Sequence, residues 1–104
     1  MRAWTSSYPA RFVAMVTYDQ AVFDIDLGFN IFTRQTIGME LDIEKFEASK
    51  KVFLARRIEN YLATAHRITL TLFWGDSDDA GTYAEIDVDG EDLIDLLDRG
   101  GFLS

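Results

Sequence analysis

Residues 42–74 read DIEKFEASKKVFLARRIENYLATAHRITLTLFW, and the spacing of their hydrophobic residues changes from helical to alternating. The helical spacing predicts a helix over residues 43–63. Asp42 is expected to cap its start, and the acids Glu44 and Glu47 suit the positive end of the helix dipole. The apolar residues that carry this spacing are Phe46, Phe53, Leu54, Ile58, Tyr61 and Leu62.

Residues 66–74 return to strict alternation, which predicts a strand. Its inward-facing residues are expected to be Ile68, Leu70, Leu72 and Trp74. A second strand is predicted at residues 82–88, with Ala84, Ile86 and Val88 on one face. The dipeptide at residues 89–90, Asp-Gly, is typical of a turn, and a short helix from Leu93 to Leu97 is expected to stop at Gly100 and Gly101.

The stretch before residue 42 predicts three more strands. Phe12, Ala14 and Val16 alternate with their neighbours, residues 21–27 form a cleaner alternating segment that ends at Leu27, and residues 29–39 read as a third extended segment. The predicted order is therefore β-β-β-α-β-β-α. A mainly β chain with five strands and a helix between the third and fourth has the layout of an OB-fold barrel.

The chain has 104 residues, which suits a single domain spanning residues 1–104. It has no cysteine, so no disulfide or thiolate metal site is expected. The longest apolar run near the N-terminus, residues 12–16, has five residues, whereas a membrane-spanning helix needs about 20. We therefore expect a soluble, cytoplasmic protein with no membrane association.

The net charge of −8 is concentrated in one part of the chain. Ten acids lie within residues 76–98, which contain no Lys or Arg. They are Asp76, Asp78, Asp79, Glu85, Asp87, Asp89, Glu91, Asp92, Asp95 and Asp98. Such a field repels phosphate backbones and attracts cationic surfaces. The acids form either a solvated face or a surface on which a basic protein docks.

Three blocks of sequence are similar to the staphylococcal nuclease family, and together they cover most of the chain. They are residues 11–29, RFVAMVTYDQAVFDIDLGF, residues 36–42, TIGMELD, and residues 81–102, GTYAEIDVDGEDLIDLLDRGGF. The resemblance implies the OB barrel of that family, and the D-x-D-L-G-F ending of the first block is similar to phage-type members. It also implies a phage origin, with a host cytoplasm as the place of action.

The resemblance further implies where nuclease residues should stand. Family nucleases use calcium held by aspartates, a glutamate near the attacking water and two arginines that stabilise the phosphate charge. At the metal positions this chain keeps only Asp19 and Glu40. These two could hold a calcium ion with help from carbonyls and water, or they are a remnant pair without a ligand. We therefore expect no resident cofactor, with calcium as the alternative.

The remaining catalytic positions depart from the family. The first arginine position is Gln35, with Arg34 beside it, and a one-residue slip places a strand side chain on the opposite face. The glutamate position is Ile43, with Glu44 adjacent, and the second arginine position is Gly81. Because each lost charge clamp costs a factor of about 10²–10³ in rate, we do not expect an enzyme.

Other residues admit a structural and a functional interpretation. Asp24 and Asp26 are expected on the solvated face of a strand, and His66 has no second histidine or cysteine for zinc. The basic residues of the helix could contact nucleic acid or form salt pairs such as Glu47–Lys51. The aromatic residues that could either pack internally or stack on nucleic-acid bases are Tyr18, Phe32, Phe73 and Tyr83, while Trp4 and Tyr8 could dock the N-terminal segment onto the barrel.

Three functions follow, and the first is favoured. The chain is predicted to be a non-catalytic interaction protein whose acidic region binds and inhibits a basic nucleic-acid-handling or defence protein by imitating the charge of DNA. The second hypothesis is a divergent metal-dependent nuclease that uses Asp19, Glu40, Arg34 and Glu44. The third is a single-strand-binding OB module, which the clustered acids disfavour.

Overall fold

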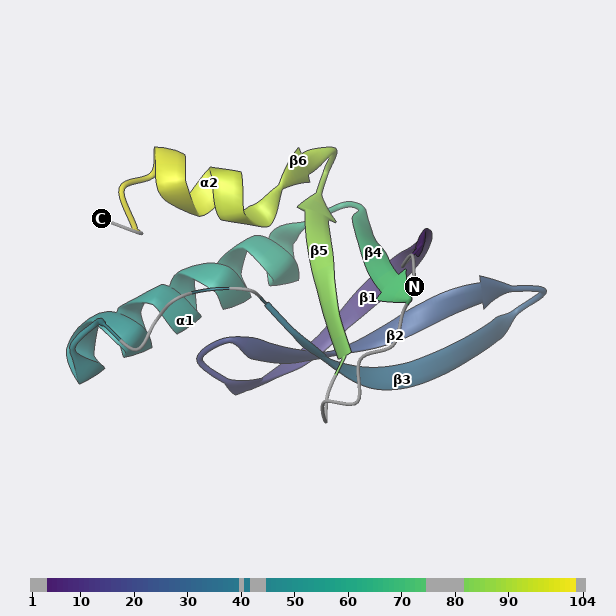
Figure 1. Cartoon of the computed structure of the whole chain (residues 1–104), viewed down its shortest axis with the longest axis horizontal. Helices are drawn as coiled ribbons and strands as arrows, with labels where there is room; N and C mark the ends of the chain where they lie inside the picture. The colour runs from purple at the N-terminus through teal and green to yellow at the C-terminus, as the bar shows by residue number, and fades with distance from the viewer. Residues whose placement is uncertain (1–3, 40, 42–44, 75–81, 103–104) are drawn as a thin grey trace.

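The computed structural model describes residues 4–39, 41, 45–74 and 82–102. Seven elements longer than two residues follow one another, with a two-residue strand before the last helix (Figure 1). The elements are β1 (Trp4–Thr17), β2 (Gln20–Gly28), β3 (Ile31–Gly38), α1 (Ala48–Thr64), β4 (Ile68–Trp74), β5 (Thr82–Val88), β6 (Glu91–Asp92) and α2 (Leu93–Arg99).

The long strands form a closed, mixed barrel of the OB-like type. β1 pairs antiparallel with β2 and with β4, β2 pairs with β3, and β4 pairs with β5. The barrel closes where β3 and β5 run parallel, at the pairs Ile37–Thr82 and Gly38–Tyr83. The coarse prediction of a mainly β, OB-like barrel with two helices is therefore confirmed.

The barrel core is built from the alternate residues that the sequence assigned to it. On β2 the side chains of Ala21, Phe23 and Ile25 are buried. On β4 and β5 the predicted inward residues are buried too, namely Ile68, Leu70, Leu72, Ala84, Ile86 and Val88. Leu54, Ile58 and Leu62 of α1 and Leu93 and Leu97 of α2 complete this core at one end of the barrel. Trp74 was also predicted to face inward, but its side chain lies outside those described.

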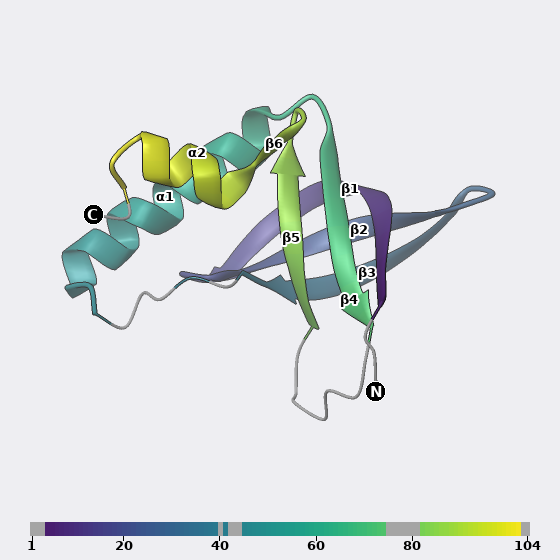
Figure 2. The same ribbon diagram turned by 45° about the horizontal axis from the view of Figure 1, so that its top comes forward.

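The β2–β3 hairpin extends away from the helices (Figure 1). In Figure 2, β4 and β5 cross this hairpin near its base, and β3 pairs with β5 only at its last two residues. At the tip, Phe29 and Asn30 have φ values of 55° and 61°, as in the type I′ turns that join antiparallel strands. The hairpin thus carries its tip beyond the closed part of the barrel.

The predicted start of the first helix is wrong. The helix begins at Ala48 rather than residue 43, and Glu47 occupies its N-cap position without a side-chain hydrogen bond. Asp42 and Glu44 lie outside the described residues. Phe53 is on the exposed side of α1, with 55% of its surface accessible, because the buried stripe runs through Leu54, Ile58 and Leu62 alone.

The prediction for β1 is wrong about where the strand begins and about which of its residues face inward. The strand begins at Trp4, and its first seven residues pair with β4, so Tyr8 packs against the core. A register shift between Phe12 and Ala14 changes which face is buried: Phe12 and Met15 point inward. Val16, expected on the same face as Phe12, is exposed. A bulge of this kind adds one residue to the strand and reverses the alternation beyond it.

No helix within the described part of the chain combines the length and the apolar character needed to cross a bilayer.

Candidate interaction site

The outer face of β5 presents carboxylates because the strand alternates. Ala84, Ile86 and Val88 fill the barrel, so the residues between them, Glu85 and Asp87, point away from it. Asp87 also pairs across the ladder with Asp92 of β6. The strand thus leads directly into the acidic segment that follows it.

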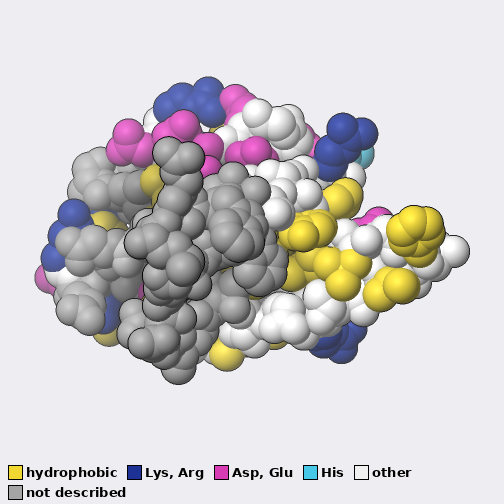
Figure 3. Space-filling model, turned by 45° about the vertical axis from the view of Figure 1, so that its right-hand side comes forward, with side chains coloured by type: hydrophobic (Ala, Val, Ile, Leu, Met, Phe, Trp, Pro, Cys, Tyr) yellow, Lys and Arg dark blue, Asp and Glu magenta, His cyan; other side chains and the backbone are white. Residues whose placement is uncertain are grey.

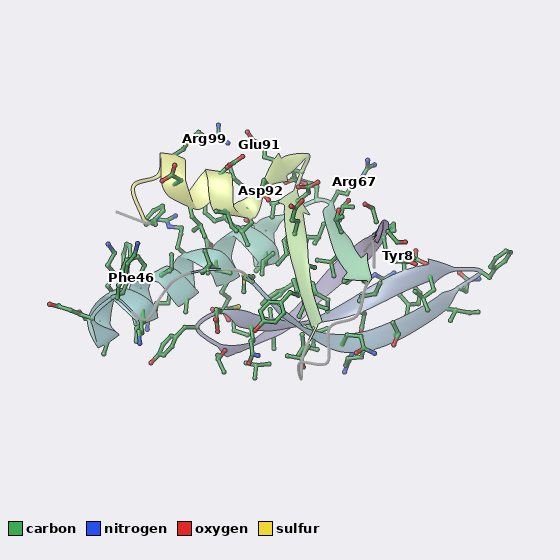
Figure 4. All side chains as sticks on the ribbon, viewed as in Figure 1. Tyr8, Phe46, Arg67, Glu91, Asp92 and Arg99 are labelled. Atoms are coloured by element: carbon green, nitrogen blue, oxygen red, sulfur yellow. The ribbon has the colours of Figure 1, made fainter. Side chains whose placement is uncertain are left out.

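The segment β6–α2 places four more acids beside β5. Asp92 is the N-cap of α2 and accepts a hydrogen bond from the backbone N–H of Asp95 at 3.3 Å. Asp95 lies in the first turn, where a negative charge is favourable next to the helix N-terminus. Glu91 forms an ion pair with Arg99 at 2.7 Å, which raises the pKa of the Arg99 guanidinium. Figure 4 shows Glu91, Asp92 and Arg99 together on this side of the molecule.

Asp89 uses its carboxylate within the fold. Its Oδ1 accepts hydrogen bonds from the backbone N–H groups of His66, at 2.9 Å, and Arg67, at 2.7 Å. These bonds hold the start of β4 against the β5–β6 turn. The predicted role of Asp89 in partner binding therefore competes with this internal role.

The other four described acids of residues 82–98 form no ion pair with a described cation. No ion pair within residues 45–74 and 82–102 involves Glu85, Asp87, Asp95 or Asp98. Together with Glu91 and Asp92 they form what we call the acidic face, which Figure 3 shows as a group of magenta side chains along one side of the molecule. Asp76, Asp78 and Asp79, which were predicted to belong to it, lie outside the described residues.

The structure describes only some of the residues at the positions where the resemblance predicts nuclease residues. Asp19 lies in the β1–β2 turn, where its Oδ1 accepts from the Thr17 hydroxyl at 3.2 Å. Its backbone carbonyl accepts from the N–H of Met39 at 2.8 Å, so the chain just before Glu40 lies beside Asp19. The side chains of Glu40, Ile43, Glu44 and Gly81 lie outside the described residues, and the predicted Asp19–Glu40 metal pair stays a prediction.

Arg34 is engaged by another side chain. Its Nε and Nη2 donate to the two carboxylate oxygens of Asp24 at 2.8 and 3.0 Å. This pairing lowers the pKa of Asp24 and raises that of Arg34. The β2–β3 register is regular from Gln20 to Asp26, so Gln35 lies on the opposite face and donates to the Thr33 hydroxyl instead. Asp24 is thus on the outer face as predicted, but paired.

Among the described residues, no cluster of three or more His, Asp or Glu side chains is suited to hold a metal ion. The imidazole of His66 is 95% exposed and lies 3.8 Å from Asp89 Oδ2. Two small clefts lie beside His66, and their lining residues include Arg11, Arg67 and Phe32.

Two of the cations of α1 pack on aromatic rings, and the predicted salt pair is not seen. No ion pair joins Glu47 to Lys51 among the described residues. Lys50 Nζ lies 4.4 Å from the centre of the Phe46 ring, and the Arg57 guanidinium lies 4.7 Å from that of Phe102. Such contacts cover apolar surface while the charge stays hydrated.

Three of the aromatic residues with two interpretations are partly exposed. Tyr18, Phe32 and Tyr83 each leave 39–47% of their surface accessible. They do not form one platform: the Phe32 ring is covered by the Arg11 guanidinium at 5.0 Å, and Tyr83 lies against Gly38. The side chain of Phe73 lies outside those described.

An apolar pocket at the open end of the barrel was not predicted from the sequence. Its volume is about 350 Å³. It is lined by Tyr8, Ile25, Leu27, Thr33, Gln35, Ile37 and Leu72. The neighbouring hairpin tip exposes Leu27, Phe29, Ile31 and Phe32. A signal was present in residues 27–32, LGFNIF, since four large apolar residues surround a turn that is normally polar.

No protein-family model and no curated protein matches this chain. The similarity to the staphylococcal nuclease family therefore stays a prediction from the quoted blocks. Its implications for calcium, for phage origin and for activity stay predictions with it.

Proposed function

We propose that this chain is a non-catalytic interaction protein built on an OB-like barrel. Its acidic face binds a basic surface of a protein that handles nucleic acid or acts in defence, and it inhibits that protein by occupying the place of the phosphate backbone. The observation that supports the proposal is the set of outward carboxylates on β5 and α2 that form no ion pair within the described residues, namely Glu85, Asp87, Asp95 and Asp98.

The net charge of the whole chain, as well as the acidic face, favours a cationic partner. A net charge of −8 on 104 residues sets up a one-sided negative field, which speeds encounter with a cationic partner and repels nucleic acid. The acids lie on a hydrogen-bonded strand and a capped helix, so the backbone that carries them is ordered before binding. An ordered backbone loses little further conformational entropy on binding, which favours affinity.

The state of Arg34 supports a binding role over a hydrolytic one. A guanidinium that stabilises a phosphate in a transition state must have its donors available. Arg34 instead gives two hydrogen bonds to Asp24. The nuclease hypothesis would require this pair to open for each turnover.

The test compares the wild-type chain with a variant in which three outward acids lose their charge, Glu85→Gln, Asp87→Asn and Asp95→Asn. These residues are chosen because their side chains form no ion pair with any described residue, so the fold should persist. The control is Glu47→Gln, at the N-cap of α1, combined with Glu59→Gln on α1, and both acids are exposed. Each tagged chain is used to capture proteins from a cell lysate, and bound proteins are identified by mass spectrometry.

We expect the wild type and the control to retain the same basic protein, and the triple variant to lose it. Added salt or duplex DNA should release this protein, because both compete for the same cationic surface. Equal capture by the triple variant, or capture insensitive to salt, would contradict the proposal. Cleavage of DNA or RNA by the purified chain with added calcium, abolished by Asp19→Asn, would favour the nuclease hypothesis instead.

A further inference from the structure

The β2–β3 hairpin carries an apolar tip that nothing in the proposed function uses. Leu27 is 46%, Phe29 97% and Ile31 56% exposed. Figure 3 shows yellow side chains gathered along this projecting part of the molecule. Soluble proteins rarely leave a contiguous apolar patch of several hundred Å² without a partner.

The backbone at the tip makes Phe29 unusual. Its φ of 55° is in the left-handed region, where Asn or Gly would be favoured and a bulky aromatic residue is costly. The next residue, Asn30, fits its own positive φ. A fully exposed phenylalanine in a conformation that opposes it gains nothing inside one copy of the chain.

A cavity suited to this ring lies on the same hairpin. The pocket at the open end of the barrel has a volume of about 350 Å³ and walls formed by Ile25, Leu27, Ile37, Leu72 and Tyr8. Two of its polar wall residues are bonded to each other, since the Gln35 amide donates to the Thr33 hydroxyl at 3.0 Å. No charged residue is among its lining residues within the described chain. An apolar side chain could enter it without stripping water from a charge.

We propose that two copies of this chain form a symmetric dimer in which Phe29 of each copy inserts into the barrel-end pocket of the other. Phe29 and Ile25 are four residues apart on one hairpin, which is about 13 Å in an extended strand. If two hairpins lie antiparallel with a two-fold axis midway along that distance, each tip meets the other copy's pocket. Such an interface is self-complementary, as two-fold symmetry requires.

The charge distribution and the apolar surface area are both compatible with a second copy of this chain as the partner at the hairpin tip. Two chains of charge −8 repel one another, but α2 with its acids lies at the end of the molecule opposite the hairpin tip (Figure 1). The pocket has no charged lining residue among those described, and the tip carries one acid, Asp26, so copies meet there with less repulsion than at the acidic face. Phe29, Ile31 and the pocket rim offer roughly 400–500 Å² of apolar surface per copy. The total of about 800–1,000 Å² is at the low end for specific association and gives a weak, reversible dimer.

The test is sedimentation velocity of the full chain over a range of protein concentrations. The wild type should change from monomer to dimer as concentration rises. Phe29→Ala should raise the dimer dissociation constant at least about tenfold. Phe29→Asn should do the same while keeping the turn, because Asn accepts a positive φ. The matched control is Phe53→Ala, which removes an equally large exposed ring on α1 and should leave the dimer unchanged.

A mixing experiment tests the reciprocal geometry. Leu27→Glu places a charge at the pocket rim, so this variant should be monomeric although its Phe29 is intact. Mixed with Phe29→Ala, it should form more dimer than either variant alone, because one intact ring can enter one intact pocket. A wild type that stays monomeric throughout, a dimer that survives both Phe29 variants, or a mixture without recovery would each overturn the proposal. None of these results depends on the acidic face, so the proposed function is tested separately.

Discussion

Asp89 and Arg67 are joined by two reciprocal hydrogen bonds. The Asp89 carboxylate accepts from the Arg67 backbone N–H at 2.7 Å, and the Asp89 backbone N–H donates to the Arg67 carbonyl at 2.8 Å. The pair connects the segment after α1 to the β5–β6 turn, 22 residues along the chain. An acid that the charge pattern assigned to a partner thus also orders the backbone of its own barrel.

Replacing Asp89 with Ala should destabilise the fold, whereas Asn should preserve it. Alanine leaves two backbone N–H groups without their acceptor and must adopt a φ of 52°, so we expect a loss of about 1–3 kcal/mol in the free energy of unfolding. Asparagine keeps an acceptor oxygen and tolerates positive φ. Urea denaturation of both variants measures the difference. Equal loss in Asp89→Asn would show that the charge, not the geometry, carries the stability.

Gly38 is required by the ring of Tyr83 at the point where the barrel closes. A Cβ atom built on Gly38 would lie 2.8 Å from Tyr83 Cε1. We expect Gly38→Ala to lower the free energy of unfolding by about 1–2 kcal/mol, as overpacking does. In a Tyr83→Ala background the same change should cost much less. A double-mutant cycle by thermal denaturation tests this, and additive effects would mean that the two residues do not interact.

Relief of the strained turn should stabilise the hairpin. Phe29→Asn replaces a residue that opposes positive φ with one that accepts it, so we expect a gain of about 1 kcal/mol in the free energy of unfolding. The measurement is chemical denaturation at a concentration low enough to keep the chain monomeric. Ile31→Asn, outside the positive-φ positions, is the control and should give no gain. A loss of stability in Phe29→Asn would show that the ring contributes to the monomer.

The Asp24–Arg34 pair should appear in the titration of Asp24. Its pKa is lowered, first by the hydrogen bond from Arg34. The stabilisation is therefore complete above the unfolded pKa of about 3.9 and is lost as pH falls through the lowered folded pKa. Arg34→Gln should raise the Asp24 pKa toward its ordinary value, as followed by carboxyl NMR. Arg56→Gln on α1 serves as the control, and an unchanged Asp24 pKa in Arg34→Gln would contradict the pairing.

The sequence predicted the barrel where its alternation is unbroken. The inward residues of β4 and β5, such as Leu70 and Ile86, follow strict period two and were placed correctly. In β1 the bulge after Phe12 reverses the phase, and no local residue type marks its position. The predicted helix start is wrong because Asp42 and Glu44 look like an N-terminus, while the described helix begins at Ala48 with Glu47 as its N-cap.

The candidate site, too, could be predicted only in part from the sequence. The acidic face could be predicted because carboxylates on β5 must point outward once Ala84 and Ile86 point inward. The internal role of Asp89 and the engagement of Arg34 by Asp24 could not, since both depend on partners brought close by the fold. The pocket required the side chains of four strands to meet at one end of the barrel.

The central claim is that the outward carboxylates of β5 and α2 are the binding surface. The most direct measurement is a titration of the isotope-labelled chain with a short oligoarginine peptide at low salt, read as NMR shift changes per residue. We predict changes grouped at Glu85, Asp87, Asp95 and Asp98, absent from the β2–β3 hairpin, and abolished by high salt or by the triple neutral variant. Changes centred on other residues, or unaltered by the triple variant, would contradict it.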